Sequence, residues 1–113
     1  MKIENPPGNN YTTDSAVIND GNWHHVCGVY DRDTSLNAYT DGQLTSSNTS
    51  FSSAVNYDIS NASNFAIGNG SPGYLSGQLD EIQVFNYALT ANQVKSLYNQ
   101  GSAIRFAPAT GTP

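Results

Sequence analysis

The chain has 113 residues, of which 37% are hydrophobic, and this allows one thin core and argues against a two-lobed enzyme. A formal net charge of −5 with only four Lys and Arg argues against nucleic acid as a partner, because no basic stripe can release phosphate counterions. Apolar runs of only a few residues argue against insertion into a membrane. Cys27 is the one cysteine, which excludes an internal disulfide and a cysteine-based metal cluster.

Neutral polar side chains dominate the composition. Asn, Ser and Thr number 14, 13 and 9, and there are seven Tyr. Asn and Ser favour turns, while Thr and Tyr suit half-buried sheet surfaces, so the composition predicts an all-β protein. Residues 1–10 contain Pro6-Pro7-Gly8 and are expected to form a flexible lead-in without the apolar stretch of a signal peptide. We therefore expect an extracellular or cell-surface location only if the chain is part of a larger exported protein.

The first clear strands are predicted in the middle of the first half. Trp23–Asp31 and Leu36–Asp41 are rich in β-branched and aromatic residues, and the turn-like residues 31–34 between them predict an antiparallel pair. Asp41-Gly42 is a hairpin signal, because Gly adopts a positive φ without steric cost. Gln43–Thr45 is therefore predicted to return against the preceding strand.

The second half is predicted to contain shorter strands separated by polar loops. Residues 46–53 are almost all Ser, Thr and Asn and predict a loop, and residues 54–59 and 64–68 predict two short strands. The glycines and proline of residues 68–73 predict an irregular loop. Residues 79–86 (LDEIQVFN) show the clearest strand pattern in the chain, because apolar and polar residues alternate along them.

One helix is predicted near the C-terminal end. Thr90 and Gln93 have the spacing of a capping box, and Leu89 and Val94 can form a hydrophobic staple across it. Gly101 offers a stop after about two turns. Three apolar side chains share one face of this helix and must pack on the sheet: Val94, Leu97 and Tyr98.

Three segments together carry a likeness to a known family. They are residues 20–31 (DGNWHHVCGVYD), residues 36–44 (LNAYTDGQL) and residues 65–98, which begin with FAIGNG and continue as GYLSGQLDEIQVFNYALTANQVKSLY. In this order they resemble the laminin G-like family of concanavalin A-like sandwiches, a superfamily that also includes pentraxins and β-glucanases. The resemblance implies an antiparallel jelly-roll β sandwich with one short C-terminal helix. We assign residues 11–106 to this domain and residues 107–113 to a tail.

The resemblance covers only about the C-terminal half of a complete domain of this family. Such a domain has several strands before the segment that starts with Trp23, whereas this chain has about twenty residues there and one candidate strand at Tyr11–Ile18. Half a jelly roll leaves strand edges and apolar faces uncovered. Either residues 1–20 close a smaller sandwich, or a second copy completes it. We expect the second arrangement and therefore a homo-oligomer.

The residues do not suggest an enzyme. Glucanases of the superfamily place catalytic carboxylates on one strand as Glu-x-Asp-x-x-Glu, whereas this chain has only Glu4 and Glu81. Asp80 and Glu81 are neighbours on a predicted strand, so they point to opposite faces. The same argument stops His24 and His25 from chelating one metal together, and His25 is expected in the core.

Calcium is the one cofactor that the resemblance implies. Many sandwiches of this kind hold a structural calcium ion through the Asp of the closing strand, which is Asp80 here. One carboxylate does not supply the six or more oxygen ligands that calcium takes, and the other ligands come largely from strands that this chain lacks. Asp80 as a solvated or turn-capping residue stays the alternative.

The predicted ligand-binding face lies on the central strands. Strand alternation places Asn37, Tyr39 and Asp41 on one side, and His24 and Tyr30 extend this face from the neighbouring strand. Aromatic rings and polar side chains together suit a glycan or a protein surface, so we expect a non-catalytic binding module. Cross-strand tyrosines that merely stabilise the sheet are the alternative reading of these residues. The competing function is a structural module that self-associates and binds no small ligand.

Overall fold

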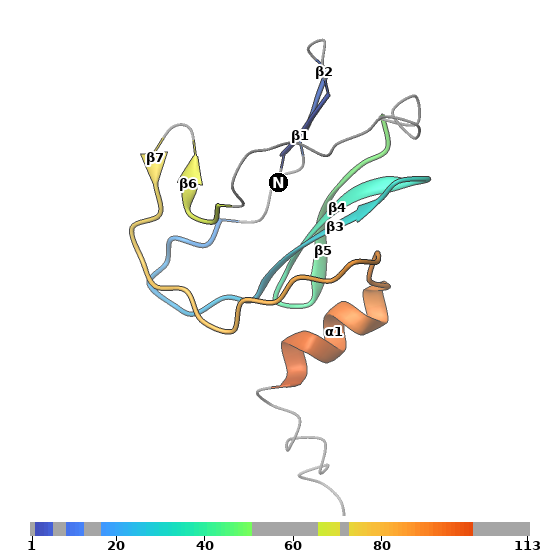
Figure 1. Cartoon of the computed structure of the whole chain (residues 1–113). Helices are drawn as coiled ribbons and strands as arrows, with labels where there is room; N and C mark the ends of the chain where they lie inside the picture. The colour runs from blue at the N-terminus through green and yellow to red at the C-terminus, as the bar shows by residue number, and fades with distance from the viewer. Residues whose placement is uncertain (1, 6–8, 13–16, 51–65, 71–72, 101–113) are drawn as a thin grey trace, which may run out of the picture.

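The computed structural model describes residues 2–5, 9–12, 17–50, 66–70 and 73–100 (Figure 1). Its strands form three antiparallel sheets, with the orders β1-β2, β3-β4-β5 and β6-β7, and one helix follows them. The elements are β1 (Lys2–Asn5), β2 (Asn9–Thr12), β3 (Val26–Asp31), β4 (Ser35–Thr40), β5 (Gln43–Asn48), β6 (Asn69–Gly70), β7 (Gly73–Tyr74) and α1 (Ala91–Gln100). The predicted class, antiparallel β-structure with one short helix, is confirmed. The described strands do not show the complete jelly-roll sandwich that was predicted.

The central sheet is built from the predicted strand pair and the hairpin that follows it. The register pairs Cys27 with Tyr39 and Val29 with Asn37, so these four side chains lie on one face. The β3–β4 turn is closed by a hydrogen bond from Thr34 N to Asp31 O of 3.2 Å. The strand pair and its turn are confirmed, except that β3 starts at Val26, three residues later than predicted.

The β4–β5 hairpin turns at Asp41-Gly42, as the sequence predicts. Asp41 and Gly42 have φ values of 50° and 74°, which is the pattern of a two-residue type I′ turn. β5 continues to Asn48, so the predicted loop starts later than residue 46. The reason is a cross-strand bond: Ser47 Oγ lies 2.6 Å from Asn37 Oδ1 and donates to it, which lets this polar stretch serve as an edge strand.

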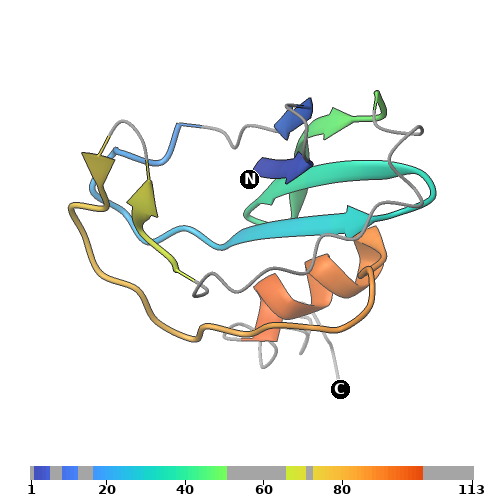
Figure 2. The same ribbon diagram turned by 45° about the horizontal axis from the view of Figure 1, so that its top comes forward.

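Helix α1 starts where its capping box predicts. Thr90 N donates to Gln93 Oε1 at 2.8 Å, and Gln93 N donates to Thr90 Oγ1 at 3.2 Å. This reciprocal pair satisfies two backbone groups that have no partner within the helix. The helix is ten residues long, somewhat more than the two turns expected. Both views show it lying along the β3-β4-β5 sheet, with the β6–β7 hairpin away from it (Figures 1 and 2).

The core described by the structure lies between the central sheet and α1. Val29, Tyr39 and Val94 form one buried cluster, and Cys27 and Leu89 pack against it. The predicted packing of Val94 on the sheet is thereby confirmed. Leu36 and Ala38 are also buried, and their alternation with Asn37 and Tyr39 places them on the opposite face of β4.

The expected strand over residues 79–86 does not form. The segment runs from β7 to α1 without pairing, and Glu81 has a φ of 53°, which interrupts an extended conformation. A strand needs a neighbour for its backbone N–H and C=O groups, and none of the described strands is paired with this segment. An alternating pattern predicts which side chains of a strand share a face, but it does not show that a neighbouring strand is present to pair with it.

Other local expectations differ in smaller ways. The lead-in of residues 1–10, expected to be flexible, contains β1 and the first half of β2, which pair from Lys2↔Thr12 to Asn5↔Asn9. The irregular loop of residues 68–73 contains the short β6–β7 pair. The strand expected at residues 54–59 lies outside the described residues, and Ala66 to Gly68, the described end of the next one, are not in a strand.

Candidate functional site

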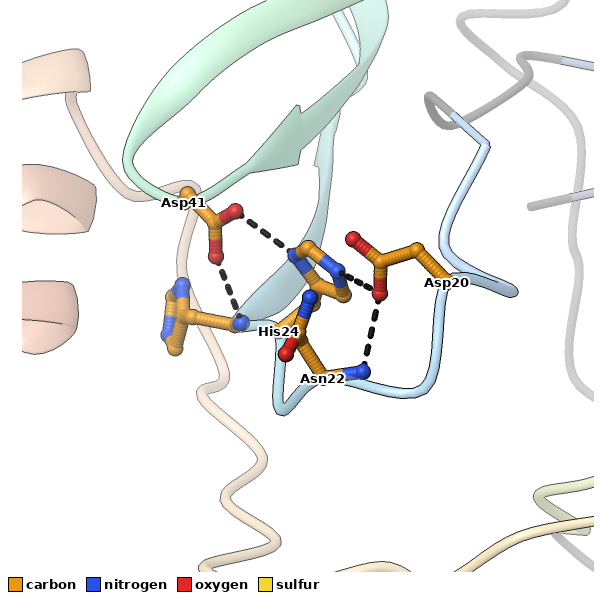
Figure 3. A network of polar contacts seen from close by, with 5 residues as sticks. Asp20, Asn22, His24 and Asp41 are labelled. Carbon is orange, nitrogen blue, oxygen red and sulfur yellow. Dashed lines mark hydrogen bonds and ion pairs between the residues drawn. The ribbon is translucent and has the colours of Figure 1, made fainter.

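A polar network joins the segment before β3 to the β4–β5 turn (Figure 3). His24 lies at its centre between two carboxylates: its Nδ1 is 2.8 Å from Asp41 Oδ2, and its Nε2 is 3.0 Å from Asp20 Oδ1. The three residues come from two chain segments that meet because β4 runs antiparallel to β3, which places the residue after Thr40 beside the residues before Val26. We call this group the His24 network.

Asp20 is fixed by its own backbone turn. Its Oδ1 accepts a hydrogen bond from Asn22 N at 2.9 Å, and Gly21 between them has a φ of 86°. This local bond is typical of an Asp that starts a turn. The carboxylate is therefore oriented before it meets the His24 ring.

Asp41 contacts the β3 side of the network in three ways. Its Oδ2 faces His24 Nδ1, its Oδ1 accepts from His25 N at 3.0 Å, and its own backbone N donates to His25 O at 2.8 Å. Asp41 has a backbone in the left-handed region, and both its carboxylate and its backbone N–H point toward residues 24 and 25. The hairpin turn is thus attached to residues 24 and 25 by side-chain and main-chain bonds together.

The electrostatics of the network favour a charged histidine. Ionised carboxylates only accept hydrogen bonds, so both His24 ring nitrogens must carry a proton for both contacts to form. The hydrogen bonds to Asp41 and then Asp20 raise the pKa of His24 above its usual range. The pKa of Asp20 is lowered, chiefly by its hydrogen bonds with Asn22, and that of Asp41 is lowered chiefly by His24. The His24 side chain is 18% exposed.

This arrangement suits holding two segments together better than it suits catalysis or metal binding. Both ring nitrogens of His24 face carboxylates as donors, which leaves no ring lone pair for a metal or for a substrate proton. Within residues 17–50, 66–70 and 73–100, no group of three His, Cys, Asp or Glu side chains comes together in a way that could hold a metal ion.

The predicted ligand-binding face is partly assembled and partly overturned. His24 and Asp41 do come together. Asn37 and Tyr39 share one face of β4, but Tyr39 is only 5% exposed and lies in the core beneath α1, so its predicted outer position is wrong. Tyr30 pairs with Leu36 and therefore lies on the opposite face from Tyr39. Strand alternation predicted the sharing of a face correctly and could not predict which face the helix covers.

Asp80, the predicted metal ligand, has a local partner. Its Oδ1 accepts a hydrogen bond from Glu81 N at 2.8 Å, and both residues are exposed. This bond stabilises the left-handed conformation of Glu81. The turn-capping alternative therefore describes the contact that the structure shows for Asp80.

A second candidate site is an exposed apolar stretch, residues 79–87, which we call the apolar segment. Ile82 and Val84 are 58% and 75% exposed. The Phe85 and Tyr87 rings meet edge to face, with centroids 5.8 Å apart and planes at 67°. With Leu79, five large hydrophobic side chains in nine residues are exposed, and such a patch marks an interaction surface.

Sequence reasoning found the members of the His24 network only in part. Asp20 was not singled out, although its spacing of four residues from His24 is visible in the sequence. The contact between His24 and Asp41 spans 17 residues and depends on the hairpin register.

No helix among the described residues is long and apolar enough to cross a membrane.

Comparisons with known proteins place this geometry in a fold family. No curated protein matches the chain. A crystal structure of an S-layer domain-containing protein (residues 221–444) from Clostridium thermocellum matches with a TM-score of 0.50 and 24% identity. The match covers 80% of this chain and 45% of that chain, so this chain spans less than half of the neighbour's length. A laminin G family model, described as the concanavalin A-like lectin/glucanases superfamily, matches residues 2–95. The chain therefore belongs to the concanavalin A-like lectin/glucanase superfamily.

Proposed function

We propose that the chain is a non-catalytic structural module that binds protein through the apolar segment, residues 79–87. The partner that we propose is a second copy of this chain. The observation that carries this proposal is the exposure of five large hydrophobic side chains in a stretch whose alternation is that of a half-buried strand.

The balance between buried and exposed apolar side chains supports association. Among the described residues, five hydrophobic side chains are buried, whereas fourteen large ones are exposed. Scattered exposed hydrophobics are ordinary on protein surfaces, but several of them gathered in one short segment are not. The apolar segment holds five in nine residues, and covering it would stabilise a complex by about 25 cal/mol for each Å² of apolar surface removed from water.

The amount of chain also favours a partner of similar size. More than half of the fold neighbour has no counterpart in this chain, because the match covers 45% of it. A second copy would supply a comparable length of β-rich polypeptide. The neighbour is named as an S-layer domain-containing protein, and we propose a cell-surface setting for this module as well.

The charge pattern of the apolar segment is compatible with pairing between copies. Asp80 and Glu81 lie at its N-terminal end, and the rest of the segment carries no charged side chain. An antiparallel pair would set the acidic end of one copy against the Phe85 and Tyr87 end of the other. Like charges would then stay apart, whereas parallel pairing would bring the carboxylates together.

Light scattering and sedimentation of the whole chain test this proposal. The expected result is a dimer at micromolar concentration. The double variant Ile82→Asp, Val84→Asp should be monomeric, with an unchanged circular dichroism spectrum because both side chains are exposed in one copy. Val17→Asp is the matched control, because Val17 is 82% exposed outside the apolar segment, and it should stay dimeric.

Three results would contradict the proposal. A native chain that is monomeric at high micromolar concentration would exclude the second copy as partner. Equal dimerisation of the double variant and the native chain would place the interface elsewhere. Retention of the native chain on a glycan array, lost in the double variant, would assign the apolar segment to carbohydrate binding.

A further inference from the structure

The structure assigns a second property to this chain, which is separate from the apolar segment. We propose that His24 is a pH-dependent latch: as an imidazolium it donates one hydrogen bond to Asp20 in its own segment and one to Asp41 in the β4–β5 turn, and loss of one ring proton breaks one of these two bonds. The proposal stands on the geometry of the His24 network and on the donors and acceptors that it brings together.

The first step of the argument is the proton count. His24 Nδ1 and Nε2 lie 2.8 and 3.0 Å from oxygens of Asp41 and Asp20. A neutral imidazole has one N–H and one lone pair, so one of these contacts would set a lone pair against a carboxylate. Both contacts are favourable only with two ring protons, and the network therefore holds its full set of bonds only while His24 is charged.

The second step concerns the other charged groups around the ring. Asp20 and Asp41 both stabilise the imidazolium, and their lowered pKa values keep them ionised in mildly acidic solution. His25 follows in the chain, with its ring 5.9 Å from the Tyr98 ring of α1. On the helix side, Lys95 Cα approaches within 3.5 Å of the Cβ position of Gly42, which follows Asp41. The two carboxylates are the described charged groups in hydrogen-bond contact with His24.

The third step is what the latch holds. Residues 20–25 lie outside any strand before β3, and Trp23 is exposed within them. Asp41 remains bonded to His25 when His24 loses a ring proton, because Asp41 N donates to His25 O and His25 N donates to the Asp41 carboxylate, whose lowered pKa keeps it ionised. Deprotonation of His24 therefore loosens residues 20–24, through loss of either the bond to Asp41 or the bond to Asp20, while the start of β3 stays attached to the turn.

Nuclear magnetic resonance of the histidine rings tests the protonation state. In the native chain at pH 6, His24 should show protons on both ring nitrogens, and it should titrate above the value of about 6.5 of an unperturbed histidine. Asp20→Asn and Asp41→Asn each replace one anionic acceptor and should lower the His24 midpoint. Asp33→Asn removes the same charge from the β3–β4 turn and should leave it unchanged.

Fluorescence of Trp23, the one tryptophan in the chain, gives a second readout. Its emission should change with the same midpoint as the His24 ring, and the change should be lost in His24→Gln. If Asp41→Asn does not fold, Asp20→Asn on the exposed side of the network carries the test alone. A singly protonated His24 ring at pH 6, or a midpoint equal in the native chain and Asp20→Asn, would overturn the proposal.

Discussion

The ring of Tyr98 on α1 lies 3.1 Å from the position that a Cβ on Gly42 would occupy. The helix therefore rests directly on the β4–β5 turn, and this turn also carries Asp41 of the His24 network. One two-residue hairpin turn thus connects the sheet, the helix and the segment before β3.

This contact predicts a large effect of Gly42→Ala. The new methyl group would press on Tyr98 and would also occupy a backbone with a φ of 74°, so unfolding should become easier by about 2–3 kcal/mol. Gly21→Ala is the matched control, because Gly21 has a φ of 86° and open space at the Cβ position. Gly21→Ala should lower the free energy of unfolding by about 1 kcal/mol, because it adds only the backbone strain of an Ala at positive φ. Equal losses in urea unfolding would show that Tyr98 does not press on the turn.

Val94 is predicted to be the helix residue that matters most for stability. It is fully buried between α1 and the sheet, in contact with the cluster of Val29 and Tyr39. Val94→Ala should lower the free energy of unfolding by about 2 kcal/mol, measured by urea denaturation. Val84→Ala removes the same atoms from an exposed position and should change the stability of a monomer by less than about 0.5 kcal/mol.

The cap of α1 predicts a smaller loss at Thr90. Thr90→Ala removes the hydroxyl that accepts from Gln93 N, which should destabilise the chain by about 1 kcal/mol. Ser96→Ala is a useful comparison, because the Ser96 hydroxyl donates to Asn92 O inside the helix rather than capping an end. That change should be close to neutral in thermal unfolding. A Ser96→Ala loss as large as the Thr90→Ala loss would argue against the capping role.

Local signals explain why some elements were predictable. The hairpin at Asp41-Gly42 and the capping box at Thr90 each depend on residues within four positions, and both form as expected. The segment of residues 79–86 depends on a partner strand for its backbone groups, and the sequence of a strand does not contain its partner. Alternation predicted correctly that Asn37 and Tyr39 share one face. It could not predict that this face is buried, because Tyr39 is covered by Val94 of α1, far along the chain.

The candidate site also has a part set by local sequence and a part set by strand register. Asp20, Asn22 and His24 lie within five residues, and the Asp-Gly-Asn turn is visible in the sequence. The contact of His24 with Asp41 follows from the β3–β4–β5 register, because the turn returns beside the residues that precede β3. The sequence alone predicted two members of the network, His24 and Asp41, and predicted neither Asp20 nor the contacts among the three residues.

Cys27 is predicted to react slowly. Its side chain packs against the core cluster, and burial raises the pKa of its thiol, so little thiolate forms at pH 8. Labelling with a thiol reagent such as DTNB should be at least about tenfold slower in the native chain than in urea. Val29→Ala, which loosens the same cluster, should speed the native reaction. Equal rates in buffer and urea would contradict the packing of Cys27 against the cluster.

The pH dependence of stability follows from the His24 network. The raised pKa of His24 means that its contribution is complete below about pH 6.5 and is lost as the pH rises through the folded-state pKa. The lowered pKa values of Asp20 and Asp41 mean that their contribution is complete above about pH 4 and is lost as the pH falls. The free energy of unfolding should therefore be highest between these two limits and decline on both sides. His24→Gln should flatten the alkaline side of the profile, and urea titrations at closely spaced pH values measure it. If stability declines equally at alkaline pH in His24→Gln and in the native chain, the pH dependence belongs to groups outside the network. If the alkaline decline is lost in His24→Gln, it arises from the two hydrogen bonds that the His24 ring donates.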